Sequence, residues 1–555
     1  MGLLFMNNKK LKLIIGASMI GVMALLGLFS FGDVKYSSKE GLSYEEKKRD
    51  AKYLIDFLEN AYPYFEEIKK ESGQDILGNK SKIINSISKT SSDEDFYNNI
   101  FALLRKHIYG MADVSYNWEH LSTYSAYIDK ELGIDYNSYR DKVTKGKEKW
   151  EPIQRNYWEK AFTPGNVTFI YINGDYYVDR SQSPNAHIGD KLTKIEGIPV
   201  DDYVKKMPLD KYFSTYDYNY EKYTSSYYVT YLKDKNSKKK ITLKNSQGEE
   251  LEVDLVPYDE NKPLLEDGYN KIKSTNYSSQ EEMDAARKAR ESKPFLNSLE
   301  NEKITALNFS AYMDISTYDT QPAKRENLFL NIDKSNALIL DLRGGFDRIF
   351  LSDILGYISS KDIEYFDYRV FKKNKVIDEY INSYKNKINP FISEVTSPIE
   401  ALEKTYPLSE YYIFKEKGFE IKSKNRYKGK IFILFDGSFS NDYSLELINV
   451  AIENDLATVI SNRKLNLKDF QYDSVISTIL PNSNLLIEVN TGKGVDENGV
   501  FIENKLITPQ VILQKDTNMI IDRLKRGEGE VSSSLNEERY NNEDEYYKEV
   551  LKLIN

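Results

Sequence analysis

The second half of the chain alternates short apolar runs with segments of helical periodicity. The runs "ITALNFSAY", "ALILDLRG", "GKIFILFDGS" and "ATVIS" predict strands, and the second and third are apolar enough to be buried on both faces of a sheet. Between them, "DRIFLSDILGYIS" and "YSLELINVAIEND" have the spacing of helices. This alternation predicts a layered α/β core, in which "NLLIEVNTGKGV" is a further strand with an extended tail.

The N-terminal part of the chain has a different, helical pattern. Ser43 and Glu46 form a capping-box signature, apolar residues then recur at helical spacing, and Pro63 ends the segment. A second amphipathic segment, "SSDEDFYNNIFALLRKHIYGMADVSY", carries an apolar stripe on one face. The sequence therefore predicts a helical N-terminal domain.

Between these two parts of the chain, the spacing of hydrophobic residues changes from that of helices to the shorter spacing of strands. Two hairpins are predicted, one turning at Asn173-Gly174 and one near Gln247-Gly248. The acidic C-terminal end is expected to form a peripheral helix. The predicted units are a membrane anchor or signal segment (1–38), a helical domain (39–160), a β-rich module (161–258), a charged linker or helix (259–300), an α/β core (301–520) and an acidic C-terminal helix (521–555).

The amino-acid composition excludes several kinds of active site. The 555 residues include no cysteine and three histidines, which excludes disulfides, thiolate catalysis and Cys-ligated zinc or iron–sulfur centres. The histidines have no metal-site spacing, so we expect neither a metal nor a cofactor. The net charge of -9 disfavours nucleic acid as a partner.

Residues 13–32 form an uncharged apolar stretch that is long enough to span a bilayer at about 1.5 Å per residue. Lys9, Lys10 and Lys12 precede it and orient the rest of the chain outside the cytoplasm. We expect a single-pass anchor in the cell membrane. The alternative is a cleaved signal peptide and a secreted protein, although no A-x-A-like cleavage site is evident.

Residues 431–450, "IFILFDGSFSNDYSLELINV", run from an apolar strand through a serine-rich corner into a helix. A serine at such a corner lies at the positive end of a helix dipole, near free backbone N–H groups. With a base and oxyanion donors it becomes a nucleophile. Alternatively, Ser438 or Ser440 is only a helix cap.

Four segments in order resemble one family of enzymes. "GDKLTKIEGIPVDDYV" resembles a PDZ-like domain, and "LILDLRGGFD" resembles the strand and glycine turn of the C-terminal-processing (tail-specific) and tricorn-like serine peptidases. The serine corner and "ILPNSNLLIEVNTGKGVDENGVFIENKLITPQVIL" resemble the nucleophile and closing segments of that family. The resemblance covers roughly residues 45–520 and implies a PDZ-like module with a layered α/β, crotonase-like peptidase core.

The resemblance implies roles for particular residues. Ser440 matches the nucleophile, and Ser438 matches the first residue of the Ser/Thr-x-Ser pattern. The oxyanion donors would be the backbone N–H groups of Asn441 and of Gly344 or Gly345, since glycine lets a backbone approach closely.

The general base is where the sequence departs from the family. One branch uses a lysine in a glycine turn, and the corresponding stretch here offers Lys464 and Lys468 without that turn. The other branch uses a histidine, and Asp113 stands near its place, flanked by His107 and His120. The residues that we take forward as candidate bases are Lys468 and His107.

The leading hypothesis is therefore an extracytoplasmic serine peptidase that hydrolyses polypeptides through an acyl-enzyme on Ser440. A PDZ-like module binds extended peptides by strand addition and holds their terminal carboxylate, so it would guide chain ends to the site. Because the base motifs are degraded, the alternative is a catalytically inactive surface protein that binds peptides or cell-wall material.

Overall fold

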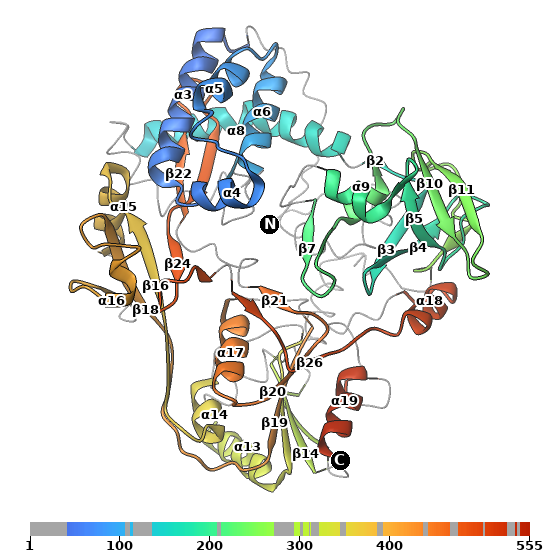
Figure 1. Cartoon of the computed structure of the whole chain (residues 1–555), viewed down its shortest axis with the longest axis vertical. Coiled ribbons are helices and arrows are strands. Elements are labelled where there is room, and N and C mark those ends of the chain that lie inside the picture. The colour runs from blue at the N-terminus through green and yellow to red at the C-terminus, as the bar shows by residue number, and fades with distance from the viewer. Residues whose placement is uncertain are drawn as a thin grey trace.

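The structure is a computed structural model of the chain (Figure 1). It describes residues 41–105, 112–114, 136–161, 163–207, 213–270, 294–299, 303–309, 311, 321–343, 351–385, 392–436, 442–466, 475–502, 505–529, 539–540 and 544–555. Within these ranges no helix is both long and apolar enough to cross a membrane. The predicted anchor at residues 13–32 lies outside them.

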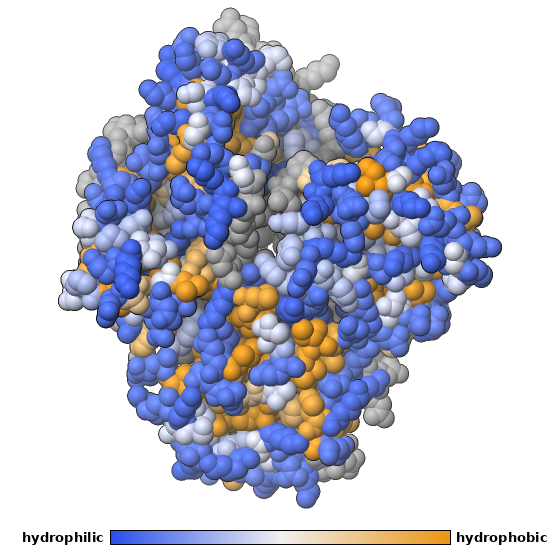
Figure 2. Space-filling view, viewed as in Figure 1, coloured by the Kyte–Doolittle hydropathy of each residue, from blue (hydrophilic) through white to orange (hydrophobic). Residues whose placement is uncertain are grey.

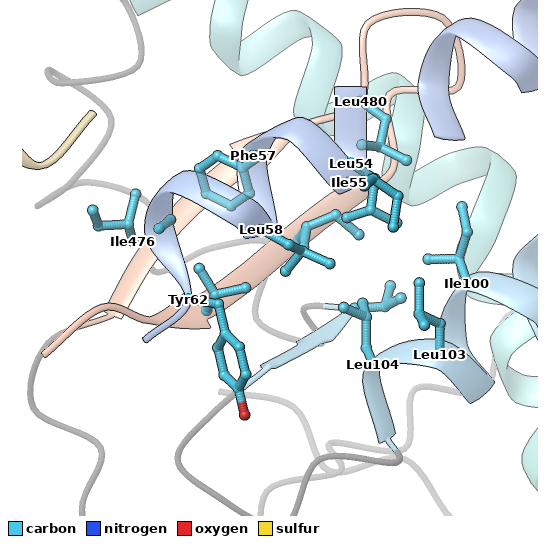
Figure 3. Packing of buried hydrophobic residues seen from close by; sticks show 14 of the residues in the cluster. Leu54, Ile55, Phe57, Leu58, Tyr62, Ile100, Leu103, Leu104, Ile476 and Leu480 are labelled. Atoms are coloured by element: carbon cyan, nitrogen blue, oxygen red, sulfur yellow. The ribbon is translucent and has the colours of Figure 1, made fainter. Parts of the chain in front are cut away.

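The N-terminal domain packs helices against a small antiparallel sheet, β1-β23-β22. Its elements are α3 (Tyr44–Ala61), α4 (Phe65–Ser72), α5 (Lys80–Ser88), α6 (Asp93–Arg105), α8 (Tyr136–Ala161), β1 (Ala112–Val114), β22 (Val475–Ile479) and β23 (Leu486–Asn490). The predicted capping box of α3 is confirmed: Ser43 N donates to Glu46 Oε2 at 2.8 Å, and Glu46 N donates to Ser43 Oγ at 3.3 Å. Apolar side chains of α3 and α6 share one core with Ile476 and Leu480 (Figure 3).

The sequence predicted "NLLIEVNTGKGV" as a further strand of the α/β core, and this prediction is wrong. Its first part is β23, which pairs antiparallel with β1 and β22 beneath the N-terminal helices. The turn between β22 and β23 is fixed from α3, where the buried carboxylate of Asp50 accepts from the backbone N–H groups of Asn482 and Ser483, both at 2.8 Å. Long-range packing, and not periodicity, assigns this strand to its sheet.

The β-rich module has its own core of buried strand residues. Its elements are β2 (Thr163–Pro164), β3 (Val167–Ile172), β4 (Asp175–Ser181), β5 (Lys191–Ile195), β6 (Ile198–Pro199), α9 (Val200–Lys206), β7 (Thr215–Asp217), β8 (Lys222–Thr224), α10 (Ser226–Thr230), β9 (Tyr231–Leu232), β10 (Lys239–Lys244), β11 (Glu250–Leu255) and β12 (Glu266–Asp267). Both predicted hairpins are present as β3–β4 and β10–β11. At the first turn, φ is 47° at Asn173 and 91° at Gly174, which is the left-handed backbone that a two-residue hairpin requires.

Helix α18 (Thr517–Lys525) attaches this module to the rest of the protein. Ile520 and Leu524 of α18 share an apolar cluster with isoleucines of the module. The Asn173 amide also donates to the Lys515 carbonyl at 2.5 Å. The module is therefore fixed to residues 515–524, which lie far from it in the sequence.

The core contains a sheet of order β13-β14-β15-β19-β20-β26, which is parallel except for β13. Its elements are β13 (Leu296–Leu299), β14 (Ile304–Asn308), α13 (Pro322–Lys334), β15 (Ala337–Asp341), α14 (Leu351–Ile358), β19 (Lys430–Phe435), α17 (Asp442–Glu453), β20 (Thr458–Ser461), β21 (Leu465–Asn466), β25 (Leu506–Ile507), β26 (Val511–Ile512) and α19 (Glu545–Ile554). Beside it lies the antiparallel sheet β17-β18-β16-β24 with two helices. These elements are β16 (Ile363–Lys372), α15 (Lys375–Lys385), β17 (Ile392–Glu394), α16 (Glu400–Glu403), β18 (Tyr411–Ile421) and β24 (Lys493–Val495).

Both faces of the parallel sheet are covered. Leu338 and Leu340 of β15 pack with α13, α14 and α17, whereas Ala337 and Ile339 face the other side. There they meet buried residues of α19, which lies across the sheet from α17 (Figure 1). The expectation of a peripheral C-terminal helix is therefore wrong, because α19 forms the second helical layer. The predicted fold class, a multidomain α/β protein with a layered core, is confirmed.

Candidate active site

The two predicted catalytic segments follow neighbouring strands of the parallel sheet. Asp341, the last residue of β15, is paired in register with Leu434 of β19. The glycine turn follows β15, and the serine corner follows β19. Because carboxyl ends of parallel strands meet at one edge of a sheet, both segments leave the core at the same edge.

The predicted site residues themselves lie outside the described part of the chain. These are Ser440, Asn441, Gly344, Gly345, Lys468 and His107, together with the alternatives Ser438 and His120. The structure describes the elements that lead into and out of their segments. Their roles remain predictions.

Helix α17 begins at Asp442, directly after the serine corner. Its apolar residues Leu445, Ile448 and Ala451 are fully buried in the core. The helix N-terminus is thus held at the carboxyl edge of the sheet, where its dipole favours negative charge. An oxyanion that forms beside it would be stabilised.

Two other residues near the family's base positions, Lys464 and Asp113, lie within the described part of the chain. Lys464 is partly buried between β20 and β21, and its backbone N–H donates to Asn219 Oδ1 of the β-rich module at 2.7 Å. Asp113 lies in β1, paired with Glu488 of β23. The third histidine of the chain, His187, contacts Glu266 through Nδ1 at 2.7 Å within the module.

A buried charge network lies at the end of β15 and was missed by sequence reasoning. Arg343 is 2% exposed, and its guanidinium donates to Asp341 at 2.8 and 2.9 Å and to Asp544 at 2.8 and 2.9 Å. Arg539 adds a second guanidinium, 3.4 Å from Asp341. The available signal was the pair of charges in "DLR" at the end of a buried strand, since buried charges require partners.

The network controls the ionisation of Asp341. Burial by itself raises the pKa of this carboxyl, but the guanidinium groups of Arg343 and Arg539 lower it from 3.8 to about 2.

Within the described residues, no three acidic or histidine side chains converge to form a metal site.

The depressed pKa of Asp341 predicts acid sensitivity. A carboxyl with a lower pKa in the folded state stabilises the protein above its unfolded pKa, and that stabilisation disappears as the pH falls from about 4 to about 2. We expect Asp341→Asn to remove about 2 kcal/mol of the pH dependence of the free energy of unfolding in this window. Urea unfolding at pH 2–5 measures how the free energy of unfolding depends on pH in each variant. Asp254→Asn, on exposed β11, is the control, and an unchanged pH dependence in Asp341→Asn would contradict the assignment.

No protein-family model and no curated protein matches the chain. Several solved structures do. Mature CPAF is 14% identical, with 92% of this chain and 98% of that chain covered and a TM-score of 0.45. The photosystem II D1 C-terminal processing protease is 10% identical, with 88% and 99% covered and a TM-score of 0.29. Tricorn protease is 11% identical, with 84% and 37% covered and a TM-score of 0.20.

Identities and TM-scores of this size do not transfer an activity from any of these proteins to this chain. The resemblance to the tail-specific and tricorn-like serine peptidases rests on the sequence motifs themselves.

Proposed function

We propose that this protein is an extracytoplasmic serine peptidase that cleaves polypeptides through an acyl-enzyme on Ser440. One observation carries the proposal: β15 and β19, the strands that precede the glycine turn and the serine corner, are adjacent, parallel and in register at Asp341 and Leu434. A nucleophile and oxyanion donors must lie within a few ångströms of one carbonyl group. Adjacent strand ends are a prerequisite for that arrangement.

In this proposal Ser440 attacks the scissile carbonyl and transfers its proton to the base. The backbone N–H groups of Asn441 and of Gly344 or Gly345 stabilise the oxyanion, and Lys468 or His107 is the base. The amine product leaves with a proton from the protonated base. Water then hydrolyses the acyl-enzyme by the same sequence of transfers.

The apolar surface beside the candidate site favours a polypeptide substrate. Apolar side chains gather over the part of the molecule where α17, β20 and β26 lie (Figure 2). Leu506 of β25 is 42% exposed. Surfaces of this kind suit an extended chain with apolar side chains. The β-rich module would bind the chain end, and residues 13–32 would anchor the enzyme in the cell membrane.

A fluorophosphonate probe tests the proposal, because it phosphonylates a serine only when that serine is activated. We expect stoichiometric labelling, located by peptide mass spectrometry at Ser440. Heat-unfolded protein is the control and should not react. Failure of the folded protein to react would contradict the peptidase assignment.

The second candidate is a catalytically inactive protein that binds peptides or cell-wall material. It is favoured by the missing glycine turn around Lys464 and Lys468 and by Asp113 near the place of the family's histidine. It predicts that Ser440→Ala binds peptides as the native chain does. Peptide binding without probe labelling would support this second candidate.

A further inference from the structure

The C-terminal segment contacts the backbone where β15 leaves the sheet. Arg539 Nη2 donates to the Arg343 carbonyl at 2.7 Å, and Arg539 Nη1 donates to Asn308 Oδ1 at 2.8 Å. The Arg539 side chain is 8% exposed. One rigid guanidinium therefore joins the exit of β15 to the end of the neighbouring strand β14.

The Arg343 carbonyl lies just beyond the strand ladder. The ladder between β15 and β19 continues as far as Leu342 N, which donates to the Leu434 carbonyl at 2.9 Å. At the next residue, Arg343 N donates to Asp341 Oδ1 at 3.0 Å instead. Just beyond the ladder, the Arg343 carbonyl accepts a hydrogen bond from the Arg539 side chain.

The Arg343 side chain is fixed from two sides. Asp341 and Asp544 each receive two hydrogen bonds from its guanidinium. Asp544 is also the N-cap of α19, where it accepts from the backbone N–H groups of Tyr546 and Tyr547. The two carboxylates balance the two guanidinium groups, so the cluster is buried without net charge.

α19 is in turn anchored along β19. Tyr546 Oη donates to the Phe435 carbonyl at 3.4 Å, and at the other end Lys430 Nζ donates to the Leu553 and Ile554 carbonyls at 2.6 and 3.1 Å. The N-terminus of α19 therefore lies at the carboxyl edge of the sheet, beside the exits of β15 and β19. α19 runs from this carboxyl edge to the opposite edge of the sheet, where the chain ends beside Lys430. In Figure 1 the carboxyl edge faces the centre of the molecule.

A peptide group is planar, so a carbonyl that is held by a hydrogen bond also fixes the direction of the N–H in the same group. The N–H that shares its peptide group with the Arg343 carbonyl belongs to Gly344. We propose that Arg539 is a positioning residue, which orients this peptide group for oxyanion stabilisation from outside the catalytic segments. This inference rests on the proposed peptidase function.

Two variants of the full chain test the inference. Arg539→Ala removes the donor, and Arg539→Lys keeps the balancing charge but loses the two-pronged fork. We expect kcat for fluorescein-labelled casein to fall roughly 10- to 100-fold in both variants, with KM changed less than twofold, because oxyanion stabilisation acts in the transition state. Rates are expressed per fluorophosphonate-reactive site, so that unfolded molecules do not contribute. Arg526→Ala, which removes an exposed arginine paired with Glu528, is the matched control.

Amide hydrogen exchange separates this inference from the proposed function. In Arg539→Ala, exchange within residues 342–345 should accelerate at least 10-fold, while the amides of β19 keep native rates. If the native chain is inactive but Arg539→Ala shows this acceleration, the peptidase function is overturned, and only the hold of Arg539 on the Arg343 carbonyl is retained. Native kcat per site, or native exchange rates in Arg539→Ala, would overturn the positioning role.

Discussion

Replacing Ser440 with alanine is expected to lower kcat for polypeptide hydrolysis at least about 10⁴-fold and to leave the free energy of unfolding unchanged. The hydroxyl is the atom that forms the acyl-enzyme, so no neighbouring group replaces it. The residual rate would come from binding and from the oxyanion donors alone. The measurement is steady-state hydrolysis of fluorescein-labelled casein, with the urea midpoint determined on the same preparations.

Ser438→Ala is the matched control for this prediction, because it lies in the same corner and is the alternative nucleophile. We expect it to retain hydrolysis within a few fold of the native rate. If Ser438→Ala abolished hydrolysis and Ser440→Ala did not, the nucleophile would be Ser438. If neither variant changed the rate, the serine corner would not be the catalytic site.

Replacing Asp50 with alanine is expected to lower the free energy of unfolding by about 3 kcal/mol. Asp50 on α3 is fully buried, and its carboxylate accepts from Asn482 N, Asn482 Nδ2 and Ser483 N at 2.8, 2.7 and 2.8 Å. Alanine would leave the buried Ser483 N–H and the two partly buried donors of Asn482 without this acceptor. Each charge-assisted hydrogen bond contributes about 1.5–3 kcal/mol, and unpaired donors add a desolvation cost.

The loss should appear in the N-terminal domain, because the Asn482 turn joins β22 to β23 beneath its helices. Trp150 Nε1 also donates to the Ser483 carbonyl at 2.8 Å, so tryptophan fluorescence reports on this turn during urea unfolding. Asp56→Ala, on the exposed face of the same helix, should change the stability by less than 0.5 kcal/mol. A similarly small change in Asp50→Ala would show that the turn does not depend on this carboxylate.

Local signals were sufficient for the elements whose partners are close in the sequence. The capping box of α3 and the Asn173-Gly174 turn depend on residues within a few positions of each other, and both are present. The apolar runs at β15 and β19 were also identified, because strands buried on both faces have no polar alternation. Short-range physics therefore predicted the parallel strands that lead to the candidate site.

Long-range contacts decided the rest. The run that contains β23 is as apolar as a strand of the parallel sheet, and its place beneath the N-terminal helices follows from pairing with β1 and β22. The acidic composition of residues 521–555 suggested a peripheral helix, but the buried Tyr546, Tyr547 and Val550 share one face of α19. Average composition does not reveal a buried face.

By itself, the sequence determined the helical, β-rich and α/β character of the successive parts, and it identified the glycine turn and the serine corner as the candidate catalytic segments. Only the tertiary structure decided that the strands before these segments are adjacent, that α19 covers the second face of their sheet, and that Arg539 and Asp544 contact Arg343. The physical reason is that local propensity depends on neighbouring residues, whereas pairing across about 200 residues is decided by the burial of complementary surfaces and charges.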